Sequence, residues 1–111
     1  MKESVTVKIF GKEYTIPFPN VGQYYRIEST KQAISSGMYN SMLLSNTLSA
    51  QNALDMIDIE ATLIVLCPEL IKDLKVENFS KLGIKDYREI KNVYFKEVAP
   101  FFKEINDLLR S

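Results

Sequence analysis

Residues 5–16 alternate apolar and polar side chains in two short runs, which are separated by Gly11 and Lys12. A period of two is typical of strands that bury one face, and a two-residue loop that begins with glycine favours a type II′ turn. Pro17 cannot donate a hydrogen bond to a neighbouring strand, so it ends the second run. The pattern therefore predicts a β-hairpin over residues 5–16.

The predicted turn would also set the register of the two strands. It would pair Ile9 with Tyr14 and Val7 with Ile16, so that all four side chains lie on one face of the hairpin. Phe10 would lie on the opposite face, where it is free to contact a partner. Because an isolated hairpin is only marginally stable in water, its apolar face is expected to pack against helices.

Beyond the hairpin, apolar residues recur at steps of three or four, which is typical of amphipathic helices. Asn20 and Ser49 are favourable N-cap residues, Gly37 suits a helix C-terminus, and Pro68 ends or kinks a helix. Pro100 favours two helices that meet at a bend. The predicted helices cover residues 20–36, 50–67, 85–98 and 99–110, and residues 38–48 are expected to form at most a short helix.

The C-terminal region has the clearest helical period in the chain. Its apolar stripe consists of Tyr87, Ile90, Tyr94, Val98, Phe101, Ile105 and Leu108. Phe102 is adjacent to Phe101 and lies about 100° away around a helix, so the stripe assigns Phe101 to the core. Together these elements predict an α+β, mainly α fold, in which the N-terminal hairpin packs on a bundle of four to five helices. We expect residues 1–111 to form a single domain.

Composition excludes several classes of function. The 111 residues are 46% hydrophobic and 25% charged, with a net charge of zero. Nucleic-acid binding normally requires a basic excess, and no apolar stretch approaches the length of a membrane span, so neither partner is expected. The residues after Met1 contain no apolar signal segment, and the single cysteine is typical of a cytosolic protein.

The chain also lacks the usual catalytic groups. It contains no histidine, and its only cysteine, Cys67, lies in an apolar run where a buried structural thiol is expected. Asp55, Asp58 and Glu60 do not share one helix face, so they are expected to be solvated and not to hold an ion. We therefore predict no catalytic residues, no metal site and no cofactor. An enzyme that uses only carboxylates is the remaining alternative in that class.

Candidate partner-binding residues are aromatic and sulfur-containing side chains near Gly37. They are Tyr25, Met38, Tyr39 and Met42, with Phe10 as a further candidate on the hairpin. Tyrosine and methionine are enriched in binding surfaces, although the same residues can also cover the edge of a core. Residues 38–70 contain no lysine or arginine, so a basic or apolar partner could approach this segment without like-charge repulsion.

The hairpin sequence KIFGKEYTI at residues 8–16 contains an I-x-G-K-x-Y motif, and residues 98–105 read VAPFFKEI within the last helix. In these stretches and in its layout, the chain resembles bacteriophage tail assembly chaperones. The resemblance implies a small helical protein of the host cytoplasm that binds the tail tape-measure protein or tail-tube subunits. It implies no catalytic residues.

These expectations describe a non-enzymatic bacteriophage assembly factor that binds other tail proteins and could also self-associate. The alternative is a structural virion protein, such as a head-tail connector or a tail component, which would be located in the particle. A virion component should be present in intact particles, whereas an assembly chaperone should be absent from them.

Overall fold

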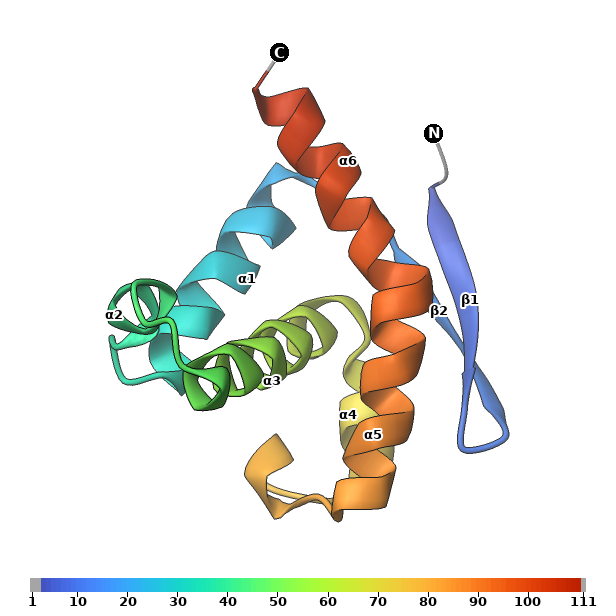
Figure 1. The fold of residues 1–111 in the computed structure, drawn as a ribbon. Helices are drawn as coiled ribbons and strands as arrows, with labels where there is room; N and C mark the ends of the chain where they lie inside the picture. Colours follow the sequence, from blue (N-terminus) through green and yellow to red (C-terminus); the bar gives the residue numbers. More distant parts are fainter. Residues whose placement is uncertain (1–2, 111) are drawn as a thin grey trace. The chain divides into compact units, whose positions relative to one another are not determined.

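The computed structural model describes residues 3–110. The elements in chain order are β1 (Ser4–Ile9), β2 (Lys12–Pro17), α1 (Val21–Ile34), α2 (Tyr39–Leu43), α3 (Leu48–Leu66), α4 (Pro68–Leu74), the 3₁₀-helix η1 (Phe79–Lys81), α5 (Ile84–Val93), the π-helix η2 (Tyr94–Val98) and α6 (Ala99–Leu109) (Figure 1). The predicted fold class is confirmed, because the described residues are mainly helical and their strands form an N-terminal hairpin.

The chain divides into two compact units. The hairpin unit combines Met1–Phe18 with Leu82–Ser111, and the central unit is Pro19–Lys81. The expectation that residues 1–111 form a single domain stays a prediction.

The predicted face of the hairpin is confirmed, but the predicted register is wrong by two residues. Val7 pairs with Tyr14 and Val5 with Ile16, while Ile9 lies opposite Lys12. A shift of two residues keeps every side chain on its face, because successive side chains along a strand alternate between the two faces. The apolar side chains predicted to share one face are therefore all buried: Val7, Ile9, Tyr14 and Ile16.

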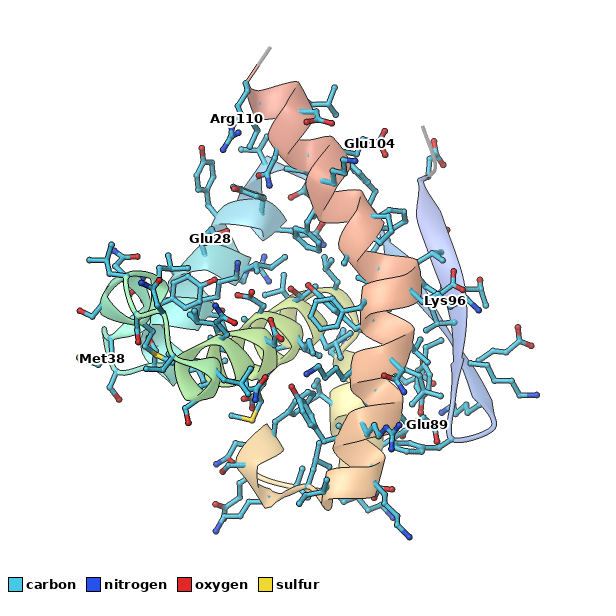
Figure 2. The ribbon with its side chains drawn as sticks, in the orientation of Figure 1. Glu28, Met38, Glu89, Lys96, Glu104 and Arg110 are labelled. Carbon is cyan, nitrogen blue, oxygen red and sulfur yellow. The ribbon has the colours of Figure 1, made fainter. Side chains whose placement is uncertain are left out.

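The register differs because the turn lies one residue earlier than predicted. Phe10 (φ 52°) and Gly11 (φ 79°) are the two loop residues, and positive φ at both central positions identifies a type I′ turn instead of type II′. The right-handed twist of the strands favours this turn, whose usual residues are Asn and Gly. The Phe10 backbone N–H donates a 2.6 Å hydrogen bond to the Glu89 carboxylate of α5, which Figure 2 shows beside the turn.

The positive φ of Phe10 strains its backbone, because the left-handed region costs a non-glycine residue about 1–2 kcal/mol. We expect Phe10→Asn to raise the free energy of unfolding by about 1 kcal/mol, since asparagine tolerates this conformation. Urea denaturation measures the change. Phe10→Ala is the control, because alanine keeps the backbone strain while removing the ring. An asparagine variant no more stable than the alanine variant would contradict the proposed source of strain.

In the hairpin unit, β1 contacts α5 and η2. The helical stripe predicted at the C-terminus is largely confirmed, since five of its members are buried: Ile90, Tyr94, Val98, Phe101 and Ile105. Leu108, the last member, is exposed. The Phe101 ring packs edge-to-face against the Phe18 ring, with 5.4 Å between the ring centroids.

Pro100 lies in the first turn of α6 and is preceded by the π-helical turn η2. A proline has no N–H, and its ring clashes with the carbonyl four residues earlier in an α-helix. Here the Ala99 N–H bonds to the Tyr94 carbonyl five residues back, so the backbone is widened just before the proline. The predicted change of helix at residues 98–99 therefore takes the form of a π-helical turn followed directly by α6.

In the central unit, α3 contacts α1, α2 and α4. Helix α1 begins with the predicted cap at Asn20, which forms a complete capping box with Gln23. Helix α3 begins earlier than predicted, because the Thr47 side chain, and not Ser49, accepts the hydrogen bond from the Ala50 N–H. Helix α4 starts at Pro68, whose missing N–H costs nothing at the first position of a helix.

Candidate functional site

The short helix α2 has one face in the core of the central unit. Tyr39 is buried with Leu54 and Ile57 of α3, and Met42 and Ile34 pack against this cluster. Tyr39 and Met42 are three residues apart, so they lie on the same side of the helix. The apolar face formed by these two residues anchors α2 to α3.

Polar contacts also hold Tyr39. Its hydroxyl donates a 2.5 Å hydrogen bond to Asp58 Oδ1, and Lys31 Nζ lies 3.5 Å from the same oxygen. Lys31 also pairs with Glu28 at 3.3 Å and lies 5.4 Å from the centre of the Tyr39 ring. The ring and hydroxyl of Tyr39 thus connect α2 to both α1 and α3.

Apolar side chains on the other side of α2 and in the residues that flank this helix are exposed. Leu43 follows Met42 directly and is rotated about 100° away from the core, and Leu44 continues that rotation. Leu44 is 85% exposed and Leu48 is 72% exposed, and Met38 and Leu43 are each more than half exposed. We refer to Met38, Leu43, Leu44 and Leu48 as the α2 surface; Met38 is labelled beside α2 in Figure 2.

The α2 surface lies in a segment without charge. Residues 32–54 contain no Asp, Glu, Lys or Arg, although a quarter of the whole chain is charged. Its polar side chains are serine, threonine, asparagine and glutamine. The α2 surface thus combines exposed apolar side chains with uncharged polar neighbours. The centre of a protein–protein interface has a similar composition, because charged residues are depleted there.

The structure separates the predicted partner-binding residues. Tyr25 is 59% exposed on α1, where its ring packs edge-to-face against Tyr24, and Met38 is exposed on the α2 surface. Met42 is half-buried, and Tyr39 is a core residue at only 9% exposure, not the surface residue that we expected. Phe10 is exposed in the hairpin unit.

The different positions of Tyr39 and Tyr25 predict different stabilities for their variants. Tyr39→Phe removes the hydrogen bond to Asp58 and should lower the free energy of unfolding by about 1–2 kcal/mol. Tyr25→Ser should change it by no more than about 0.5 kcal/mol, because the side chain is exposed. Urea denaturation compares the two. Equal losses would show that Tyr25 also belongs to the core.

Glu60 of α3 is a buried carboxylate, so the prediction that it is solvated is wrong. It is 5% exposed, and its Oε2 accepts a 3.1 Å hydrogen bond from the Phe79 N–H. Burial raises the pKa of Glu60, and the Phe79 hydrogen bond opposes this shift. The signal available in the sequence was its position within the apolar run, between Ile59 and Ala61.

The raised pKa of Glu60 predicts how stability depends on pH. The unfolded chain releases this proton near the ordinary pKa of a glutamate side chain, whereas the folded protein holds the proton to higher pH. The contribution of Glu60 to the free energy of unfolding is therefore fully present below the unfolded-state pKa. This contribution is lost as the pH rises through the folded-state pKa. The stability of Glu60→Gln relative to the native protein should therefore increase as the pH rises above the ordinary pKa of glutamate, as followed by urea denaturation. A difference that shrinks with rising pH would contradict this sign.

The other predicted chemical groups are located as follows. Cys67 is buried as expected, and this burial raises the pKa of its thiol. Asp58 is held by Tyr39 and Lys31. Among residues 3–110, no three side chains of His, Cys, Asp or Glu form a group that could hold a metal ion. None of the helices in the same range is long and apolar enough to cross a membrane.

The α2 surface and the Glu60 region are thus the two candidate sites of the central unit. The first exposes apolar side chains, and the second buries a carboxylate. In comparisons with protein-family models, curated proteins and solved structures, nothing matches this chain significantly.

Proposed function

We propose that this chain is a non-enzymatic bacteriophage assembly factor, similar to tail assembly chaperones, that binds other tail proteins through the α2 surface. The proposal combines the resemblance of residues 8–16 and 98–105 to that family with the exposed apolar side chains around α2. In this role the protein acts in the host cytoplasm and covers an apolar segment of a tape-measure or tail-tube protein before the tube assembles.

The observation that carries the proposal is the exposure of four large apolar side chains on an uncharged segment. Leaving such a surface in water forgoes about 25 cal/mol for each Å² of apolar area that a partner could cover. Tyr39 and Met42, on the opposite face of α2, hold the helix in place. The segment is therefore already folded before a partner binds. A preformed surface lowers the entropy cost of association.

The test is co-expression with the tape-measure and tail-tube proteins from the genome that encodes this chain. We expect the native protein to increase the soluble fraction of one of them and to co-purify with it. The double variant Leu44→Asp with Leu48→Asp should remain folded and lose both effects, because it adds charge to an apolar contact. Ile84→Asp is the matched control, since Ile84 of α5 is as exposed as Leu44 but lies in the hairpin unit.

Mass spectrometry of intact particles separates this proposal from its alternative. An assembly chaperone should be absent from particles and present in infected cells, whereas a connector or tail component should be present in particles in a constant ratio to other structural proteins. Recovery at such a ratio, or unchanged binding by the Leu44 and Leu48 variant, would overturn the proposal.

A further inference from the structure

A small pocket opens beside Glu60 in the central unit. It has a volume of about 320 Å³ and is lined by Ile34 of α1, Met56 and Glu60 of α3, and Asn78 and Ser80 near η1. This volume is at the small end of the range for small-molecule sites. All five lining residues belong to the central unit, so one compact body forms the pocket.

The carboxylate in this pocket has no counter-charge within the described part of the chain. Its Oε2 accepts the hydrogen bond from the Phe79 N–H, and no basic side chain of residues 3–110 pairs with either oxygen. A buried carboxylate is costly unless a cation or several hydrogen bonds compensate for its lost hydration. A positively charged ligand would supply this compensation.

The remaining polar groups at the pocket also offer acceptors. Asn78 Oδ1 accepts hydrogen bonds from both the Ser80 N–H, at 3.0 Å, and the Ser80 hydroxyl. Since the Ser80 hydroxyl donates its hydrogen to Asn78, its oxygen lone pairs remain available to accept a hydrogen bond from a ligand. Two acceptor groups, Glu60 and Ser80, therefore line the same pocket.

The rest of the pocket wall is apolar and comes from Ile34 and Met56, both half-buried. Methionine is flexible enough to adapt its shape to an alkyl chain. A ligand with an alkyl chain that ends in an ammonium group can bury its methylene groups against such an apolar wall. An ammonium group has three N–H donors and no acceptor, which matches the acceptor set of Glu60 and Ser80. A guanidinium pairs best with both oxygens of a carboxylate, and one oxygen of Glu60 already accepts the hydrogen bond from the Phe79 N–H.

We propose that this pocket binds an alkylammonium group, with the ammonium at Glu60 and Ser80 and the alkyl chain against Ile34 and Met56. The group could be supplied by a lysine side chain of another protein or by a free aliphatic amine. The proposal does not rest on the function proposed above, because the pocket and the α2 surface are formed by different side chains.

The test is titration of the ¹⁵N-labelled protein with n-butylammonium chloride at constant ionic strength, followed by NMR. We expect the Phe79 amide signal to shift in a saturable manner, because its N–H bonds to Glu60, and we expect n-butanol to cause no comparable shift. A parallel titration with N-acetyl-lysine methylamide distinguishes the sources. Binding of both compounds indicates a lysine side chain, and binding of butylammonium alone indicates a free amine.

The affinities of three variants test whether butylammonium binds in this pocket. Glu60→Gln keeps an acceptor for the Phe79 N–H but removes the charge, so affinity should fall by about tenfold or more. Ser80→Ala, at an exposed position, should weaken binding without affecting folding. Glu77→Gln is the matched control, because it removes an exposed carboxylate next to the pocket residue Asn78 and should leave affinity unchanged. Equal affinity of the Glu60→Gln and native proteins, or no saturable shift at Phe79, would overturn the proposal.

Discussion

Ile9→Lys is expected to lower the free energy of unfolding by about 4 kcal/mol or more, which is close to the whole stability of a marginal domain. Ile9 is fully buried on the face of β1 that contacts α5 and η2. A lysine ammonium at this position would have to lose its hydration or displace the strand. Thermal and urea denaturation should show a protein that is largely unfolded at room temperature.

The neighbouring position provides the control. Lys8 is exposed on the opposite face, where it lies across from Glu13. Lys8→Ile should change stability by no more than about 0.5 kcal/mol, because it removes only one exposed charge. Similar losses from the two substitutions would mean that the hairpin faces are assigned to the wrong sides.

Phe101→Ala is expected to lower the free energy of unfolding by about 3–5 kcal/mol, which is the cost of removing a buried phenylalanine and leaving a cavity. The ring is buried and packs edge-to-face against Phe18, so the substitution also removes a contact between α6 and the end of the hairpin. Circular dichroism during urea denaturation measures the loss.

Phe102→Ala is the matched control, because it removes the same ring from the next position of α6. Phe102 is only half-buried, and its loss should cost clearly less than that of Phe101. If Phe102 were the more damaging position, the turn of η2 and Pro100 would rotate α6 differently from the structure described here.

The sequence by itself determined the features that depend on short-range periodicity. The alternation in residues 5–16 identified the buried face of the hairpin, and steps of three and four identified Ile90, Tyr94, Val98, Phe101 and Ile105 as core residues. The cap at Asn20 and the helix break at Pro68 were also predictable. Each of these features is set by residues within about one or two turns of each other, so no knowledge of the tertiary contacts was needed.

Only the tertiary structure decided the strand register and the character of the candidate sites. A period of two cannot distinguish a register from one shifted by two residues. The type I′ turn at Phe10 and Gly11, whose Phe10 N–H donates a hydrogen bond to the carboxylate of distant Glu89, selected between them. Tyr39 and Glu60 are buried because other elements cover them: Tyr39 packs with α3, and Glu60 accepts a hydrogen bond from the segment at Phe79. The exposure of Leu44 has the same origin, since Tyr39 and Met42 occupy the buried side of α2 and no described segment covers the other. Burial of an individual side chain depends on which distant segments pack against it, and local pattern carries no information about that choice.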